Sequence, residues 1–152
     1  MQKWIGNAGV KSLPVIFYAK KNSKFSTQGV PIPFELERLN IGGAMSGKTG
    51  KFTAPRNGVY FFAFNGIAVI TAAEGGMNVA LMVNGNPVGT AQCKSHAGNE
   101  WENLALQSTI ELKAGDQVWL QIESISSIFL HDDESYHFTH FNGWMLQEDI
   151  IP

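Results

Sequence analysis

Cysteine is scarce in this sequence of 152 residues, where Cys93 is the only one. A single thiol excludes a disulfide within the chain, and no cysteine and histidine spacing matches a structural zinc site. Because Cys93 falls in an expected loop, we expect a free thiol rather than a catalytic nucleophile. The cysteine content therefore indicates no particular redox compartment.

Charge is scarce as well, since charged residues make up 16% of the chain against roughly 25% in an average domain. The net charge is −2, so neither sign dominates. This balance excludes the basic surface by which proteins bind nucleic acid or an anionic membrane, and no nucleic acid partner is expected. A hydrophobic share of 44% also excludes intrinsic disorder.

No hydrophobic run is long enough to cross a bilayer. The longest, residues 59–73, is interrupted by Asn65 and Gly66, whereas a spanning helix needs roughly 20 apolar residues. Residues 1–6 contain no apolar stretch of signal-peptide length, so a secreted form would have lost its leader or would use another route. We therefore expect no membrane insertion.

Glycine and aromatic residues are plentiful and typical of strands and tight turns, with 16 Gly, 10 Phe, 4 Trp and 3 Tyr. Alternating apolar residues predict half-buried strands over 104–112 and 117–123, joined by a turn at residues 113–116. Residues 59–64 predict a strand buried on both faces, and Asn84-Gly85 is the preferred pair for a tight hairpin. About eight to ten short strands at this spacing predict an all-β sandwich or jelly roll.

Four motifs follow one another in a specific order. Residues 50–62 read G-x-F-x-x-P-x-x-G-x-Y-x-F, in which we expect the two glycines to end turns and the aromatics to fill the core. Residues 112–120 read L-x-x-G-D-x-V-W-L, residues 141–146 read F-x-G-x-x-L, and Phe34 precedes Asn40-x-Gly42. Over residues 13–147 the sequence resembles the C1q globular domain.

The resemblance implies a ten-stranded jelly-roll β-sandwich shared with tumour necrosis factor ligands, usually assembled as a trimer. It implies a secreted recognition protein that is not an enzyme, and the sequence has no G-x-S-x-G element or phosphate-binding glycine loop. We expect residues 1–12 to form an N-terminal arm and residues 13–152 the C1q-like domain. Because no collagen-like Gly-X-Y run occurs, the chain resembles the stand-alone C1q-domain lectins of invertebrates, especially molluscs, several of which bind sialic acid.

The most polar stretch, residues 131–137, is the first candidate ligand site. Its carboxylates and tyrosine could hydrogen-bond sugar hydroxyls or coordinate calcium. The candidate ligand-binding residues are Asp132, Asp133, Glu134 and Tyr136. The stretch does not match the twelve-residue calcium loop, and it could instead be a solvated loop before the last strand.

A second candidate site lies in residues 94–102, where an exposed tryptophan beside amides and carboxylates would form a platform for a sugar ring. The candidate residues are His96, Asn99, Glu100 and Trp101. Trp101 could equally pack into the core or into a subunit contact. In calcium-binding relatives, acidic residues of this region lie near the trimer axis, and the resemblance places Glu102 at one such position. The other position falls at Cys93 or Lys94, so Glu102 is a candidate calcium ligand but calcium is not expected to be required.

Two histidines near the C-terminus, His137 and His140, invite a metal-binding interpretation. If residues 136–141 are extended, side chains three positions apart point to opposite faces of the strand. One ion could not then bind both, and we predict no metal site there.

Composition and resemblance together favour a non-enzymatic carbohydrate-binding lectin that acts in innate immune recognition of glycans, with sialic acid the best single ligand. A homotrimer would raise the apparent affinity of a weak sugar site by roughly 10²–10⁴. The alternative is a secreted ligand that binds a receptor protein on a cell surface. Free sugar should abolish binding in the first case and leave it intact in the second, whereas a structural or carrier protein would show no saturable binding.

Overall fold

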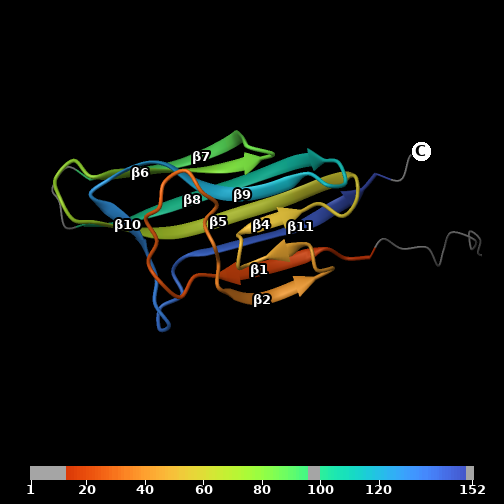
Figure 1. Cartoon of the computed structure of the whole chain (residues 1–152), viewed down its shortest axis with the longest axis horizontal. Coiled ribbons are helices and arrows are strands. Elements are labelled where there is room, and N and C mark those ends of the chain that lie inside the picture. The colour runs from red at the N-terminus through yellow and green to blue at the C-terminus, as the bar shows by residue number, and fades with distance from the viewer. Residues whose placement is uncertain (1–12, 96–99, 150–152) are drawn as a thin grey trace, which may run out of the picture.

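Two antiparallel β-sheets stacked face to face make up the computed structural model, which describes residues 13–95 and 100–149 (Figure 1). Sheet A contains β1 (Ile16–Lys20), β2 (Leu36–Ile41), β5 (Gly58–Ile70), β8 (Glu100–Leu112), β10 (Ile128–His131) and β11 (His140–Glu148). Sheet B contains β3 (Met45–Ser46), β4 (Lys51–Thr53), β6 (Gly76–Val83), β7 (Asn86–Lys94) and β9 (Gln117–Ser126). The described residues form no helix, and the expected all-β jelly-roll sandwich is confirmed.

Strand β5 joins sheet A together, because it pairs with three other strands. Along one edge it pairs with β8 over its whole length, and along the other its residues 58–65 pair with β11 and residues 67–70 with β10. The described residues contain eleven strands, where the resemblance implies ten. From β5 the sheet continues through β11 and β1 to β2, and sheet B has the order β3-β4-β9-β6-β7.

Aromatic side chains fill the space between the sheets. Phe17 of β1, Phe52 of β4 and Phe62 of β5 are each at most 1% exposed. The ring centroids of Phe17 and Phe52 lie 5.4 Å apart, and those of Phe52 and Phe62 lie 5.2 Å apart. Tilted and edge contacts of this kind add to the free energy gained by removing apolar surface from water. The aromatics of the central motif therefore form the core, as expected.

Strand β5 has two different faces. Tyr60, Phe62 and Phe64 point into the core, whereas Phe61 and Ala63 on the other face are only half-buried. The prediction that residues 59–64 are buried on both faces is therefore wrong for the single chain, because the outer face of sheet A is only partly covered.

Two turns have the chemistry that the sequence predicts. Asn84 and Gly85, with φ angles of 51° and 90°, form the hairpin between β6 and β7. In the turn between β8 and β9, the Asp116 carboxylate accepts hydrogen bonds from the Lys113 amide (2.8 Å) and from the Asn84 side chain (2.9 Å). These hydrogen bonds lower the pKa of Asp116.

An ion pair between a buried lysine and an exposed glutamate fixes the long connection between β1 and β2. Lys21 is 1% exposed, and its ammonium donates to the Glu35 carboxylate (2.7 Å) and to the Pro33 carbonyl (2.8 Å). Burial acts to raise the pKa of Glu35, but hydrogen bonds from Lys21 and from the Asn22 amide outweigh it, so the pKa is lowered. No sequence pattern indicated this pair, because only the path of the connection brings the two side chains together.

Cys93 lies in strand β7 rather than in the expected loop. Its side chain packs into the core, and burial raises the pKa of the thiol. Because a thiolate is the reactive form, a cysteine in this environment is inert. The free-thiol expectation thus agrees with the structure although the expected location was wrong.

Candidate functional site

The outer face of sheet A presents a row of mostly apolar side chains that crosses five strands. The register places Ile41, Ile16, Trp144, Phe61 and Thr109 side by side on β2, β1, β11, β5 and β8. The rings of Phe61 and Trp144 lie 4.7 Å apart, and Ile41 is exposed. An apolar sheet face is normally covered by another layer of structure. Residues 13–95 and 100–149 form no such layer over these five residues, which we call the apolar row.

Where β8 begins, aromatic side chains form a second exposed group on sheet A. The Trp101 ring lies 5.0 Å from His131 and 5.8 Å from Phe138, and the Tyr136 ring stacks on Phe138 at 5.2 Å. Trp101 is 55% exposed and Tyr136 is 62% exposed. Phe129 lies beside His131 at 6.2 Å, and we call these five residues the aromatic end cluster.

The aromatic end cluster joins the two candidate sites that the sequence indicated separately. Trp101 comes from β8 and Tyr136 from the loop before β11, and Phe138 contacts both rings. The exposure of Trp101 rules out the core-packing alternative and leaves a ligand platform or a subunit contact. Sequence reasoning missed Phe129 and Phe138 as members, because their proximity depends on the pairing of β10 with β5.

Asp132 has a structural role in the loop that carries Tyr136. It is 3% exposed, and its carboxylate accepts hydrogen bonds from the amides of Asp133 (2.8 Å), His137 (2.9 Å) and Thr139 (2.9 Å). Without it, the amide of the fully buried Thr139 would have no acceptor, and the partly buried amides of Asp133 and His137 would lose theirs. The carboxylate is therefore committed to shaping the loop.

The other two acidic residues of this stretch lie nearer the surface. The Asp133 carboxylate accepts hydrogen bonds from the amides of Ser135 (2.6 Å) and Tyr136 (3.0 Å), which is a typical turn stabilised by an Asp side chain. Glu134 is exposed. Four residues of this stretch were candidates for ligand binding. Asp132 and Asp133 shape the loop, whereas Glu134 and Tyr136 are exposed.

We expect Asp132→Ala to lower the free energy of unfolding by about 2–4 kcal/mol, because one buried and two partly buried amides lose their acceptor. Urea denaturation of the variant and the parent chain at equal concentration measures this difference. Glu134→Ala is the matched control in the same loop, and its effect should stay within about 0.5 kcal/mol. Equal stabilities for the two variants would show that the Asp132 carboxylate does not hold the loop.

Glu100 and Glu102 lie on the opposite face of β8 from Trp101, because successive strand residues alternate. Glu100 accepts a hydrogen bond from the Ser95 hydroxyl (2.7 Å). In the part of the chain that the structure describes, no three His, Cys, Asp or Glu side chains form a group that could hold a metal ion, so a calcium site at Glu102 stays a prediction. The two remaining candidate residues, His96 and Asn99, lie outside the described residues.

His137 and His140 do not share the extended segment that the sequence interpretation assumed. His137 has a φ angle of 61° in the loop, and His140 is the first residue of β11. The Nδ1 atom of His140 is buried and has no hydrogen-bond partner among residues 13–95 and 100–149. Burial and the nearby Lys20 lower the pKa of His140, and Asp132 opposes them, so the environment favours the neutral imidazole.

The strand order and the aromatic core define a jelly-roll sandwich, and solved structures share it. The globular domain of zebrafish complement 1qA matches with a TM-score of 0.70 at 18% identity, over 89% of this chain and 99% of that chain. Eiger TNF from S. frugiperda matches with a TM-score of 0.73 at 12% identity, over 93% of this chain and 98% of that chain. At these identities the likeness shows the fold alone.

The sequence comparison gives the family. The model of the C1q domain matches residues 16–146, so the chain belongs to the C1q domain family. Human complement C1q tumor necrosis factor-related protein 3 is 33% identical over 136 residues, which cover 90% of this chain and 52% of that protein. Zebrafish Caprin-2 is 28% identical over 139 residues, which cover 90% of this chain and 14% of that protein.

The chain thus spans about half or less of the length of these relatives. The C1q resemblance seen in the sequence is confirmed, and the narrower resemblance to molluscan lectins stays a prediction. None of the described residues belongs to a helix with the length and apolar character needed to cross a membrane.

Proposed function

We propose that this chain is a non-enzymatic, secreted C1q-domain ligand that forms a homotrimer and binds a protein on a cell surface. Its similarity to human C1q tumor necrosis factor-related proteins supports this function more directly than it supports a lectin. The observation that carries the proposal is the aromatic end cluster, where a tryptophan and a tyrosine are each more than half exposed. Tryptophan and tyrosine are enriched among the residues that dominate the binding energy of protein interfaces.

The apolar row supports assembly of identical subunits. A second copy packed on the outer face of sheet A would remove Phe61, Trp144 and the exposed Ile41 from water. A closed ring of three copies would cover this face in every subunit and would leave the outer face of sheet B open. The aromatic end cluster lies at the end of sheet A, beyond the apolar row.

The substitution Trp101→Ala tests the protein-ligand function. We expect the variant trimer to bind cultured cells about 30-fold or more weakly than the parent, since a central aromatic anchor contributes about 2 kcal/mol or more. Thr90→Ala, an exposed position on β7 of sheet B, is the control and should bind as the parent does. Saturation binding of fluorescent protein to intact cells gives the apparent affinities.

Treatment of the cells identifies the chemical class of the partner. Trypsin should abolish binding to the cells, whereas removal of cell-surface glycans should leave it intact. Equal binding by the parent and Trp101→Ala would overturn the role of the aromatic end cluster. Binding that survives trypsin, or the absence of saturable binding to any cell type, would contradict a protein partner.

Recognition of glycans, including sialic acid in innate immunity, is the second candidate function. One observation favours it in this cluster, namely the exposed indole of Trp101, whose apolar face and N–H edge suit a sugar ring. If glycan binding carried the function, free sialic acid would compete for the cells and glycan removal would abolish the signal. Three sites in one trimer would then supply the avidity that one shallow sugar site lacks.

A further inference from the structure

His140, the first residue of β11, has a ring nitrogen that the proposed function does not use. Its Nδ1 atom is buried and has no hydrogen-bond partner among the described residues. The imidazole lies on the outer face of sheet A, where the Tyr18 ring contacts it edge-on with 5.4 Å between the ring centroids. A buried polar atom without a partner costs free energy, so its presence needs an explanation.

Lys20 of β1 lies directly opposite His140 in the sheet. The Lys21 amide donates to the Thr139 carbonyl (3.0 Å), which makes the neighbouring pair of Lys20 and His140 a non-hydrogen-bonded one, whose side chains lie closer together. Lys20 is 4% exposed, and its ammonium makes no hydrogen bond or ion pair with residues 13–95 and 100–149. A largely buried lysine thus faces the imidazole, and no carboxylate contacts it.

The other groups around His140 do not neutralise this positive charge. Arg38 is the additional residue where the register between β1 and β2 shifts, and its charge acts on Lys20. Asp132 acts on both Lys20 and His140, but its carboxylate already accepts three backbone hydrogen bonds. On β5 the residue opposite His140 is the uncharged Asn65. A proton on His140 would therefore add a second positive charge directly beside Lys20.

His140 lies on the same face of sheet A as the apolar row. It is four residues from Trp144 along β11, which is about 13 Å at roughly 3.3 Å per residue. The side chains of the row between them are uncharged, namely Gln107, Ala63, Asn142 and Tyr18. A standard interface takes about 800 Å² from each partner, which is roughly 30 Å across. A subunit contact centred on the apolar row therefore reaches His140.

We propose that His140 is a pH-sensitive switch of subunit assembly: the neutral imidazole fits the subunit interface, whereas its protonation in mildly acidic solution adds a charge beside Lys20 and separates the subunits. This switch rests on the proposed homotrimer. A secreted ligand that has it binds its partner with three sites at neutral pH and with one in an acidic environment.

The sign of the pH dependence follows from the burial of the imidazole. Burial and Lys20 lower the pKa of His140 from its ordinary value of 6.5, and a neighbouring subunit that removes more water lowers the pKa further. The free subunit then binds protons that the trimer excludes, so the trimer weakens as the pH falls through the pKa of His140 in the free subunit. Because three histidines titrate in one trimer, the association constant falls by up to about 10³ per pH unit.

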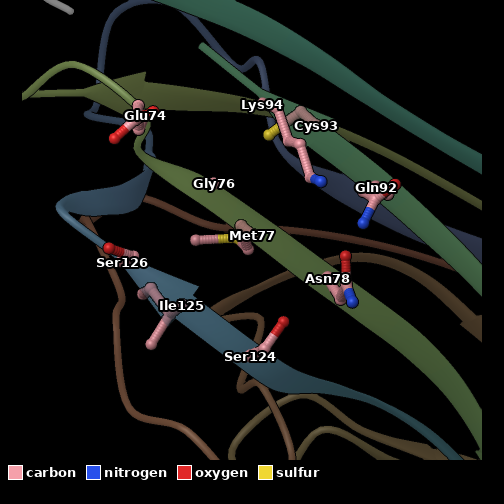
Figure 2. Close-up of a pocket in the computed structure, with 10 residues that line it drawn as sticks. All are labelled: Glu74, Gly76, Met77, Asn78, Gln92, Cys93, Lys94, Ser124, Ile125 and Ser126. Carbon is pink, nitrogen blue, oxygen red and sulfur yellow. The ribbon is translucent and has the colours of Figure 1, made fainter. Parts of the chain in front are cut away.

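The outer face of sheet B contains no competing pH-sensitive group among the described residues. Figure 2 shows the hollow on this face, where the register between β6 and β9 shifts between Asn78 and Val79. None of the residues that line the hollow is a histidine, the side chain whose ordinary pKa lies closest to neutral. The other histidines of the chain are His131 in the aromatic end cluster, the exposed His137, and His96 outside the described residues.

Light scattering coupled to size exclusion, at about pH 7.5 and about pH 5, tests the switch. We expect the parent to be a trimer at the higher pH and to dissociate at the lower one, with at least a 100-fold loss in association constant. His140→Asn keeps a neutral polar group near the Nδ1 position, and its association constant should change less than about threefold. His137→Asn is the matched control, because asparagine tolerates the φ angle of 61° there, and it should dissociate as the parent does.

An NMR titration of the ring signals of His140 in the full chain measures its pKa directly. We expect a value below 6.5 in the parent and a higher value in Lys20→Met, which keeps the length of the side chain and removes its charge. The Lys20→Met trimer should also lose less of its association constant at about pH 5. Lys48→Met, at an exposed lysine, is the control and should leave the pKa of His140 unchanged.

A parent trimer that persists at about pH 5 would overturn the switch and leave the proposed homotrimer standing. Equal acid dissociation of the parent and His140→Asn would also overturn it, as would a pKa of His140 at or above 6.5. Where His140→Asn does not fold, the Lys20→Met measurements decide. A parent that is already monomeric at about pH 7.5 would refute the homotrimer and the switch together, so the two failures are seen at different pH values.

Discussion

The substitution Gly50→Ala is expected to lower the free energy of unfolding by about 3–5 kcal/mol, which is a large share of the stability of a domain of this size. Gly50 has a φ angle of 77°, and a Cβ atom there would overlap the carbonyl oxygen of Ile32 and lie 2.8 Å from its carbonyl carbon. Both obstacles are backbone atoms, and the Ile32 amide is itself tied to the Leu120 carbonyl (2.8 Å). The chain cannot move away without breaking the contact between the β1–β2 connection and β9.

A matched glycine separates the two causes of this effect. Gly29 also has a positive φ angle, 82°, but no atom lies within 4 Å of its Cβ position. Gly29→Ala should therefore cost only the conformational penalty, about 1 kcal/mol. Urea unfolding of both variants at one protein concentration gives the comparison, because the stability of an oligomer depends on concentration. Similar losses in the two variants would mean that the close approach to Ile32 contributes nothing.

The substitution Phe61→Arg is expected to convert a trimer of about 50 kDa, three times the chain mass of 16.7 kDa, into monomers at micromolar concentration. Phe61 lies in the middle of the apolar row, with Trp144 on one side and Thr109 on the other. Three arginines would have to be buried in the assembled interface without partners, and unpaired buried charges cost several kcal/mol each. Light scattering coupled to size exclusion measures the mass directly.

The monomeric variant should keep its fold, because Phe61 points away from the core between the sheets. A far-ultraviolet spectrum and a urea midpoint close to those of the parent at low concentration check this. Thr90→Arg places the same charge on the outer face of sheet B, and it should remain a trimer. A parent chain that is already monomeric, or a Phe61→Arg variant that stays trimeric, would refute assembly through the apolar row.

Much of the fold could be predicted from local chemistry. Period-two alternation in Val118, Leu120 and Ile122 gave strand β9, and Asn84-Gly85 gave the hairpin, because both features depend only on neighbouring residues. The two glycines of the central motif were expected to end turns, and only one of them does so. Gly50 does end a turn, but Gly58 begins β5 without a positive φ angle, and a Cβ atom there would overlap the carbonyl oxygen of Gln147. The motif identified a required glycine without identifying its reason.

The candidate sites were less predictable for a physical reason. In the folded loop, three backbone amides donate hydrogen bonds to the Asp132 carboxylate. The residue types of the 131–137 stretch could not predict these hydrogen bonds, because they depend on the folded path of the loop. Likewise, the exposed Trp101 was a candidate from its neighbours in sequence, but its aromatic partners come from β10 and the following loop.

Local residue patterns are enough to predict the all-β class, the main turns and membership of the C1q family. These follow from side-chain alternation, from residues that tolerate positive φ angles and from motifs within short segments. Which side chains share a surface depends instead on how the strands pair in the folded chain. Strand register and the bulge at Asn78 are set by pairing between distant segments, and a shift of one residue moves every side chain of a strand to the opposite face. That is why the apolar row and the aromatic end cluster exist only in the folded chain.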